Sequence, residues 1–315
     1  MTRSALIIAC MVTVTLLTIV LSTITGPSGF GLVLTNPGSA EIIWGIRFPR
    51  VLAAFFIGAG LAVAGAAMQS LFKNPMADPY ILGTSSGGAL GASIAIVFLG
   101  GLFVPLFAWA GAVLAILVVW AIAGRRGVIS VESLLLTGIA VSFFFSAIVS
   151  FLIAIAGENV HQILFWLMGG FWNASYQDAA LSGVLLITAG LILFLMGRDL
   201  NALSLGEETA AHLGIDASRA RWIVLGGSTL LVGGAVSVAG SIGFIGLVTP
   251  HVVRMLLGPD NRVVIPACIL AGGILLVISD TITRTFFSDL PVGIITAFIG
   301  APFFIWLVYQ RESAA

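Results

Sequence analysis

The residue types that carry most enzyme chemistry are scarce in this chain and poorly placed for it. Its 315 residues include 3 histidines, 2 cysteines and 13 acidic residues, and the acidic residues gather at the ends of apolar runs. The stretch GTSSGGALGAS offers serine hydroxyls, but neither a His-x-x-x-His pair nor paired aspartates inside the apolar runs could activate them. A Gly-x-x-x-x-Gly-Lys-Ser/Thr loop, which binds nucleotide phosphates, is also missing. We therefore expect no catalytic residue and no ATP hydrolysis by the chain itself.

The possible metal ligands are dispersed along the sequence. Cys10 and Cys268 each lie within an apolar run, where a cysteine packs as a small hydrophobic residue, so a structural disulfide is not expected. His251 follows Pro250 in a short apolar segment, and a structural hydrogen bond explains it better than metal ligation does. We expect no metal site and no bound cofactor in this chain.

The composition indicates that apolar, membrane-spanning helices carry these few polar residues. Charged residues make up 8% of the sequence and hydrophobic residues 59%, whereas an average soluble domain is about 25% charged. The apolar runs approach the roughly 20 residues that a helix needs to cross a bilayer. The sequence therefore predicts an all-α, polytopic membrane protein in which residues 1–315 form a single transmembrane domain. About ten transmembrane helices are expected, near residues 5–24, 50–72, 79–99, 102–123, 132–156, 177–197, 222–240, 243–258, 263–284 and 291–309.

The basic residues give an expected orientation. With the N-terminus in the cytoplasm, ten of the 13 lysines and arginines fall on the cytoplasmic side, and only Arg47, Arg50 and Arg284 fall outside. Both termini are then expected in the cytoplasm. The first apolar run, of about 20 residues, exceeds the roughly 7–15 of a signal peptide, which favours a retained helix. The net charge is zero, and no basic tract suggests a nucleic-acid partner.

One polar segment interrupts the apolar pattern on the expected cytoplasmic side. Seven of the 26 charged residues (13 basic plus 13 acidic) fall between positions 198 and 221. Ser204 and Glu207 have the spacing of a capping box, and Gly214 stands where a left-handed residue would end the helix. Asp216 could then cap a second short helix that runs into the seventh crossing. We expect two rigid helices at a bend, suited to a groove on another protein, with an ordinary solvated loop as the alternative.

Four stretches of the chain carry a specific resemblance: IRFPRVLAAFFIGAGLAVAGAAMQSLFKNPMADPYILG, LGEETAAHLGI, GSIGFIGLVTPHVVRMLLGPDNRVVIPACILAG and DLPVGIITAFIGAPFFIWLV. They resemble the permease subunit of binding-protein-dependent ABC importers for iron chelates, haem and cobalamin, the FecCD-type or type II importers. Together they cover most of residues 42–309 in the family's order. The resemblance implies a permease fold of ten crossings in the plasma (inner) membrane, and a transport subunit rather than an enzyme. The implied cargo is a metal chelate (ferric siderophore, haem or cobalamin), with an oxyanion such as molybdate as the alternative.

The resemblance also implies partners. A second permease, most simply another copy of this chain, would form a homodimer with it around the substrate path. Two copies of a separate ATP-binding subunit would bind ATP and magnesium on the cytoplasmic side, and a soluble or lipid-anchored substrate-binding protein would deliver cargo from outside. ATP binding would then shift the population between outward- and inward-facing forms.

The polar segment receives a role on the same ground. By resemblance, its coupling helices, at about residues 204–221, dock into a cleft of the ATP-binding subunit and convert the closure of that subunit into helix movement. The residues implied in coupling are Ser204, Glu207, Glu208, Ala210, Ala211 and Gly214.

Two further sites are implied by resemblance. Arg47, Arg50 and Arg284 would receive glutamates of the binding protein, a task that suits the planar guanidinium fork. Lipid headgroups or local acids such as Glu41 are the competing partners for them, and Asp280, one turn before Arg284, could pair with Arg284. The residues implied at a cytoplasmic gate are Asn74, Met76, Ser130 and Ser133, although a plain turn explains the stretch KNPMADP equally well.

A secondary transporter driven by protons or sodium is the main rival function. Such transporters place ionisable groups or broken helices near the middle of the membrane to bind the coupling ion. Here the acidic residues concentrate at the ends of the expected crossings, which disfavours ion coupling. Co-purification separates the two hypotheses, because only a permease of an ABC importer should bring down an ATP-binding subunit.

Overall fold

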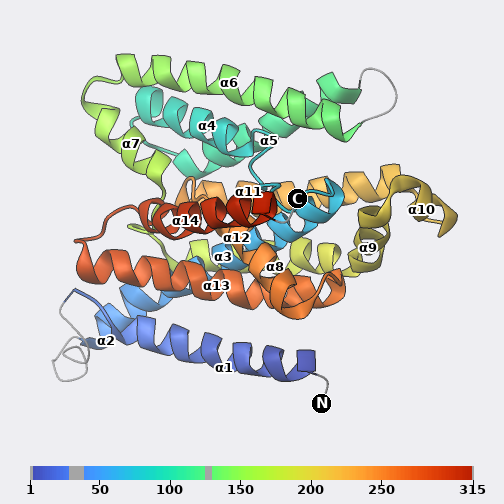
Figure 1. Cartoon of the computed structure of the whole chain (residues 1–315). Coiled ribbons are helices and arrows are strands. Elements are labelled where there is room, and N and C mark those ends of the chain that lie inside the picture. Colours follow the sequence, from blue (N-terminus) through green and yellow to red (C-terminus); the bar gives the residue numbers. More distant parts are fainter. Residues whose placement is uncertain (1–2, 28–38, 125–129, 314–315) are drawn as a thin grey trace.

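The computed structural model describes residues 3–27, 39–124 and 130–313, and every regular element in these ranges is a helix (Figure 1). In chain order the elements are α1 (Arg3–Ile24), α2 (Ser39–Glu41), the π-helix η2 (Ile42–Arg47), α3 (Phe48–Leu71), α4 (Thr84–Leu99), α5 (Val104–Ala123), α6 (Val131–Ile155), the 3₁₀ helix η4 (Gly157–Asn159), α7 (Val160–Met168), α8 (Tyr176–Leu195), α9 (Gly197–Leu205), α10 (Glu207–His212), α11 (Ala217–Ala239), α12 (Ile245–Leu257), α13 (Asn261–Phe286) and α14 (Val292–Ser313). The predicted all-α fold is confirmed.

Each of the ten expected crossings corresponds to an apolar helix. Seven are long and apolar enough to cross a membrane, among the described residues: Leu6–Ile24, Ile42–Leu71, Val104–Ala123, Val131–Ile155, Tyr176–Leu195, Ala217–Ala239 and Asn261–Phe286. Three are shorter, namely Thr84–Leu99, Ile245–Leu257 and Val292–Leu307. Large hydrophobic side chains lie exposed along α1, α5, α6 and α8, as expected where helices face lipid rather than water.

Several crossings begin at other residues than predicted, and the reasons are local. The seventh, expected from residue 222, begins at Ala217 because Asp216 caps its helix there. The second crossing begins earlier than residue 50, because α2 and η2 run directly into α3 and Pro49 occupies the first turn of that helix. The third was expected from residue 79 but begins at Thr84, because residues 79–83 form turns that end at Gly83, whose φ is +84°. The short helices α7, α9 and α10 are additional to the ten crossings.

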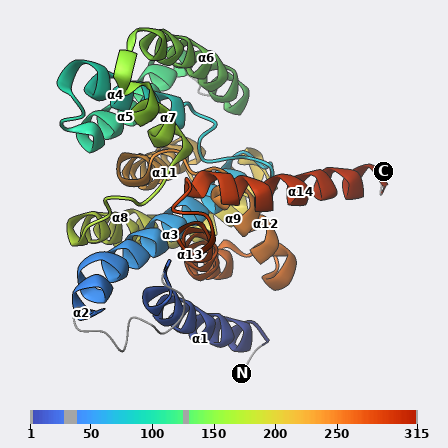
Figure 2. The same ribbon diagram turned by 90° about the vertical axis from the view of Figure 1, so that its left-hand side faces the viewer.

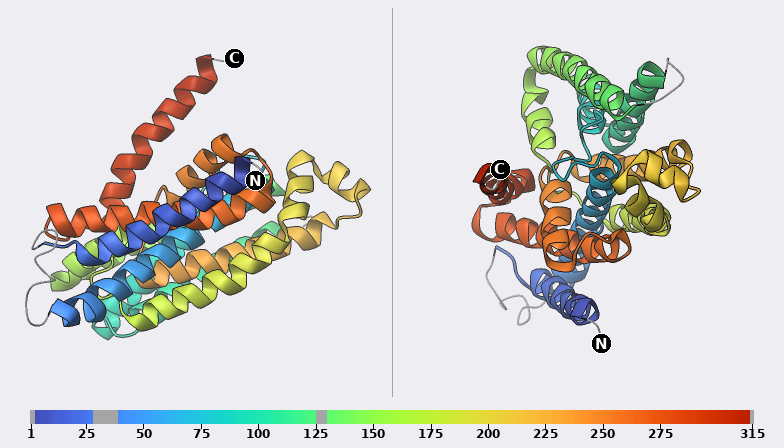
Figure 3. Two further views of the ribbon diagram at one scale, coloured as in Figure 1. Left: turned by 90° about the horizontal axis from the view of Figure 1, so that it is seen from below. Right: turned by 45° about the vertical axis from the view of Figure 1, so that its right-hand side comes forward.

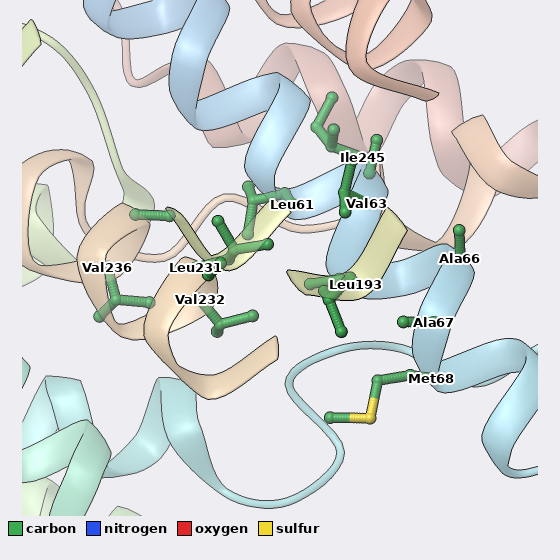
Figure 4. Close-up of a cluster of buried hydrophobic side chains, with 14 of the residues drawn as sticks. Leu61, Val63, Ala66, Ala67, Met68, Leu193, Leu231, Val232, Val236 and Ile245 are labelled. Carbon is green, nitrogen blue, oxygen red and sulfur yellow. The ribbon is translucent and has the colours of Figure 1, made fainter. Parts of the chain in front are cut away.

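Helix α3 forms the centre of the bundle, enclosed by α8, α11, α12 and α13 (Figure 2). Its glycines allow this close approach: a Cβ on Gly58 would overlap the Gly272 carbonyl group of α13, and one on Gly65 would overlap the Gly246 carbonyl group of α12. Buried side chains of α3, such as Met68, then pack with aliphatic side chains of α8, α11 and α12 (Figure 4).

Two non-helical stretches meet inside the bundle. Residues 72–83 connect α3 to α4, and residues 240–244 connect α11 to α12. The Tyr80 hydroxyl donates to the Ile242 carbonyl at 3.2 Å, and the hydroxyls of Ser85 and Ser241 lie 2.8 Å apart. The Tyr80 contact gives the Ile242 carbonyl a hydrogen-bond partner, as buried irregular backbone requires, and the serine contact joins the second stretch to the start of α4.

The outline of the molecule is uneven. Helices α4 to α7 form one layer, α1 lies on the opposite side of the central bundle, and α14 leans away from the rest (Figures 1 and 3). Helices α9 and α10 extend from one end of the bundle, whereas α2 and the start of α3 lie at the other end. The polar segment and the outer arginines are therefore far apart.

Candidate functional site

The polar segment forms two helices at a bend. Helix α10 ends in a Schellman motif, in which the Ile215 amide donates to the Ala210 carbonyl at 3.0 Å and the Gly214 amide donates to the Ala211 carbonyl at 2.9 Å. Gly214 has a φ of +77°, so its predicted left-handed conformation is confirmed. Asp216 then caps α11 as predicted, because its carboxylate accepts a backbone amide of the first turn at 3.0 Å. The bend is defined by these hydrogen bonds rather than by a loose loop.

The start of α10 differs from the prediction. Ser204 lies in the last turn of α9, where its hydroxyl donates to the Asn201 carbonyl at 2.6 Å. Helix α10 begins at Glu207 after Gly206, and no side chain caps it. The predicted capping box of Ser204 and Glu207 is therefore wrong, because α9 continues to Leu205 and takes Ser204 into its own helix.

One side of α10 packs against the bundle. Ala210 is fully buried, and the Glu207 carboxylate forms an ion pair with the guanidinium of Arg221 in α11. The Arg221 side chain is itself only 9% exposed. Glu207 therefore fastens α10 to the beginning of a long helix that reaches into the bundle.

The other side of the bend is open and partly apolar. Leu205 and Leu213 are 73% and 64% exposed, and Glu208 and Ala211 are exposed beside them. These two leucines were missed in the sequence, because apolar residues at this spacing are expected on the side of a helix that faces the bundle. Together the four side chains form a mixed surface of the kind that protein partners cover.

A network that we call the inner bracket joins α9 to three other helices. It consists of Ser70, Asn201, Arg254, Asp260 and Asn261. Arg254 donates to the Ser70 hydroxyl at 2.9 Å and to the Asn261 side-chain oxygen at 3.1 Å. The backbone and side-chain nitrogens of Asn261 both donate to the Asn201 side-chain oxygen at 2.8 Å, and Asn201 donates to Asp260 at 2.7 Å. Because α10 follows α9 directly, the bracket links the polar segment to α3, α12 and α13.

Two carboxyl groups outside the membrane-spanning helices have shifted pKa values. Hydrogen bonds from Arg262 and then from Asn201 lower the pKa of Asp260 to about 2, so this residue of the inner bracket is ionised at neutral pH. Burial raises the pKa of Asp78 to about 6, although its carboxylate accepts the Tyr80 amide at 2.7 Å.

The three outer arginines lie together in a group that we call the outer charge cluster: Arg47, Arg50, Asp280, Arg284 and Asp289. Arg50 donates to Asp280 from Nε at 3.0 Å and from Nη2 at 2.8 Å, and to Asp289 from Nη1 at 3.1 Å and from Nη2 at 2.5 Å. The Nε atom of Arg284 lies 3.6 Å from Asp280. All three arginines are buried, at 7%, 8% and 4% exposure in chain order.

The arginines also bind the end of α1. Arg47 donates to the Ile24 carbonyl at 3.1 Å, and Arg284 donates to the Ser22 carbonyl. The sequence considered Asp280 as a partner of Arg284, but its closest contacts are with Arg50, and Asp289 was missed. No periodic pattern identifies Asp289, because it lies in the turn after α13. The docking role of the three arginines stays a prediction. Any such role has to account for Asp280 and Asp289, which already bind Arg50.

The four predicted gate residues take part in local turns. The Asn74 side-chain oxygen accepts the Met76 amide at 2.9 Å, and the Ser130 hydroxyl accepts the Ser133 amide at 3.1 Å, which caps α6. Within the described part of the chain, no hydrogen bond joins one pair to the other. Their role at a gate stays a prediction.

A cavity of about 610 Å³ lies between α7, the 240–244 stretch and α14. Its wall is almost wholly apolar, and none of its lining residues carries a charge: Leu167, Met168, Ser241, Gly243, Phe244, Gly293, Ile294, Ala297, Phe298, Ala301, Pro302 and Ile305. Because α14 leans away from the bundle (Figure 3), this cavity opens on the side of the molecule from which α14 projects. The sequence did not identify these residues, since they lie within ordinary apolar runs.

The potential metal ligands lie apart. Cys10 is exposed and Cys268 is buried, and both are free thiols. His251 packs edge-on against Phe303, with ring centroids 6.0 Å apart. In the described ranges, no three His, Cys, Asp or Glu side chains gather in a group that could hold a metal ion.

Residues 5–310 match the model of the FecCD transport family. The chain is 41% identical over 292 residues to the cobalamin import system permease protein BtuC of Halobacterium salinarum, covering 92% of this chain and 78% of that one. It is 39% identical over 278 residues to the vitamin B12 import system permease protein BtuC of Citrobacter koseri, covering 86% and 83%.

Solved structures give the same result for the fold. A structure described as an inward-facing conformation of a metal-chelate type ABC transporter superposes with a TM-score of 0.89 and 33% identity, covering 96% of this chain and 99% of that chain. PsaBC from Streptococcus pneumoniae superposes with a TM-score of 0.56 at 19% identity, which is a likeness of fold alone.

Proposed function

The chain belongs to the FecCD transport family and is the multi-pass membrane permease of a metal-chelate ABC importer, and from this premise we propose that its cargo is cobalamin. The identity of 41% over 92% of the chain to a cobalamin import permease is the observation that carries the proposal. The sequence resemblance to the family is thereby confirmed. Ferric siderophore and haem are cargoes of related permeases and serve as the comparison cargoes below.

The apolar cavity supports a large organic cargo over an oxyanion. None of its lining residues is charged, and Ser241 supplies the only side-chain hydroxyl among them. A molybdate-like ion would lose its hydration there without gaining a cation, which is strongly unfavourable. A chelate with extended organic surface meets no such penalty.

We infer that two copies of the chain assemble with α14 facing the shared path. Phe298 and Ile305 are 74% and 69% exposed on this projecting helix, although both also line the cavity. A cavity that lies open along one helix needs a second wall. In a two-fold symmetric dimer, the equivalent surface of the second copy faces the cavity and supplies that wall. The path would then run between the two α14 helices.

The bend between α10 and α11 is the proposed contact for the ATP-binding subunits, which are expected in two copies and would bind ATP and magnesium. Leu205, Glu208, Ala211 and Leu213 form its open surface. The ion pair of Glu207 and the inner bracket connect this surface to the bundle, so a push on α10 is transmitted by hydrogen-bonded groups. This role places the bend in the cytoplasm, and the arginines on the outer face.

The outer charge cluster is the proposed contact for a substrate-binding protein. Its three arginines carry one more charge than its two aspartates can neutralise, so the cluster keeps a net attraction for carboxylates (3 − 2 = +1). The proposed gate residues Asn74 and Met76 lie in the turn after α3, and Ser130 and Ser133 lie at the start of α6. Small rotations there would change the width of a cytoplasmic gate.

The function is tested by reconstituting the permease with the ATP-binding subunit that co-purifies with it and with its substrate-binding protein. Uptake into proteoliposomes is measured for cyanocobalamin, haem and a ferric siderophore, with ATP or with a non-hydrolysable analogue. We expect ATP-dependent uptake of cyanocobalamin above the other two. Preferential uptake of haem or siderophore would transfer the proposal to that cargo, and uptake on an ion gradient without the ATP-binding subunit would refute it.

A further inference from the structure

We propose that Asp289 is an internal carboxylate that occupies Arg50 while the outer face is free, and that a carboxylate of the docking protein replaces it. The inference rests on the proposed docking role of the outer charge cluster. Asp289 is the residue that leaves Arg50 on docking, and the turn that carries it connects this movement to the cavity.

The two aspartates that bind Arg50 are not equivalent. Asp280 is fully buried in α13, between Arg50 and Arg284. Asp289 lies in the turn after α13 with 39% of its side chain exposed, and it binds the Nη1 and Nη2 atoms of Arg50. An incoming carboxylate can therefore reach the position of Asp289 while Asp280 keeps Arg50 in place. A guanidinium fork binds either carboxylate with the same paired geometry.

The turn that carries Asp289 has a strained backbone. Ser288 and Asp289 have φ values of +51° and +69°, and two successive residues with side chains disfavour this left-handed conformation. The turn is held by the Arg50 ion pair, by a hydrogen bond from the Asp289 amide to the Thr283 carbonyl at 3.1 Å, and by one from the Trp172 indole to the Asp289 carbonyl at 2.9 Å. Release of Asp289 lets the backbone relax, which lowers the cost of the exchange.

The cluster also has unused donors for an additional carboxylate. Arg284 is 4% exposed, yet its Nε and Nη1 atoms have no hydrogen-bond partner among the described residues. Buried guanidinium nitrogens without partners are costly, so a second carboxylate near Arg284 would be favoured. The cluster thus keeps hydrogen-bond donors for a second carboxylate beside the displacing one.

Asp289 is connected to the rim of the cavity. Its carbonyl oxygen accepts the indole nitrogen of Trp172 at 2.9 Å, and three residues later the Val292 amide donates to the Gly169 carbonyl at 2.9 Å. Met168 and Gly293, the neighbours of these two residues, line the cavity. Movement of the turn therefore bears on the junction of α7 and α14, where the cavity begins.

The exchange is tested with the assembled transporter in nanodiscs and its purified substrate-binding protein. The variant Asp289→Asn removes the competing charge but keeps the side-chain size. We expect it to tighten docking about fivefold, as expected for loss of one partly exposed ion pair. Glu158→Gln is the matched control, because it removes one exposed negative charge elsewhere, and it should leave docking affinity unchanged. Arg47→Gln tests the docking role itself and should weaken binding.

Hydrogen–deuterium exchange distinguishes exchange from a general charge effect. In the wild-type transporter, docking should reduce amide protection of residues 287–292, and Asp289→Asn should reduce it without any partner. The exchange is overturned if Asp289→Asn leaves the docking affinity unchanged, or if docking raises the amide protection of residues 287–292. Weaker docking of Arg47→Gln would in that case still support the docking role of the arginines. Unchanged docking in Arg47→Gln removes both proposals.

Discussion

Two adjacent glutamates of α10 have different surroundings and should respond differently to substitution. Glu207 pairs with the buried Arg221, whereas Glu208 is exposed on the open surface of the bend. We expect Glu207→Gln to destabilise the permease by about 1 kcal/mol through loss of the ion pair, and Glu208→Gln to leave stability unchanged. Thermal unfolding in detergent checks both.

Charge reversal of both residues should uncouple ATP hydrolysis from uptake, and unchanged transport would argue against the coupling role of this surface.

Asp78 gives the permease a pH dependence of its own. Its pKa rises from 3.8 to about 6 on folding, so the native state prefers the protonated carboxyl. Its stabilising contribution is complete below about pH 4 and is lost as the pH rises through 6, by about 3 kcal/mol. Asp78→Asn should be more stable than the wild type at pH 7.5 and equal to it near pH 4. Melting temperatures at the two pH values decide this, and an equal gain at both would exclude titration as the cause.

At the scale of the helices, packing of α3 depends on residues without side chains. A Cβ on Gly65 would overlap the Gly246 carbonyl, and neither backbone can move away easily. We expect Gly65→Ala to destabilise the bundle by about 3 kcal/mol. In α11, Gly226 has open space around it, and Gly226→Ala should stabilise the helix by up to about 1 kcal/mol. Opposite shifts of melting temperature are the expected result, and equal losses would contradict the packing argument.

The inner bracket makes α9 a connecting element instead of a spacer. Asn201→Ala removes three hydrogen bonds to Asp260 and Asn261 and should destabilise the permease by about 2 kcal/mol. It should also reduce transport per ATP hydrolysed, because α10 then moves without α13. The exposed Asn173→Ala is the control. Lower stability with an unchanged ratio of transport to hydrolysis would mean that the bracket has only a structural role.

The helices could be predicted where the local chemistry decides their ends, and not where tertiary contacts do. Gly214 and Asp216 act locally, and both were predicted correctly. The start of α10 depends on whether α9 continues, and α9 is held by the inner bracket, which joins residues far apart in the sequence. Ser204 was misassigned for that reason.

The candidate site followed the same division. Sequence reasoning brought Arg47, Arg50 and Arg284 to one face, because charge bias follows from the order of the crossings. It missed Asp289, whose position depends on the left-handed turn after α13. It also missed the cavity, since the apolar residues that line it resemble those that face lipid.

At the scale of the whole molecule, α14 should determine assembly. Ala301 lines the cavity on the helix that leans out of the bundle, and Ala301→Trp should hinder close approach of a second copy and shift the assembly toward monomers. Ala180→Trp on α8, which lies on the other side of the bundle (Figure 2), is the control for added bulk. Mass photometry in detergent measures the ratio of monomer to dimer. A dimer that tolerates Ala301→Trp would place the interface on another helix.

The open cavity beside α14 has a consequence for how cargo preference can change. If both walls of the closed chamber come from one gene, each amino-acid replacement appears twice, on facing surfaces. Independent contributions add as free energies and multiply as ratios, so a replacement that alters selectivity tenfold at one wall would alter it about a hundredfold in the pair. A few mutations would then be enough to change the cargo selectivity of a permease. After a gene duplication the two walls could change separately, and intermediate selectivities would become possible.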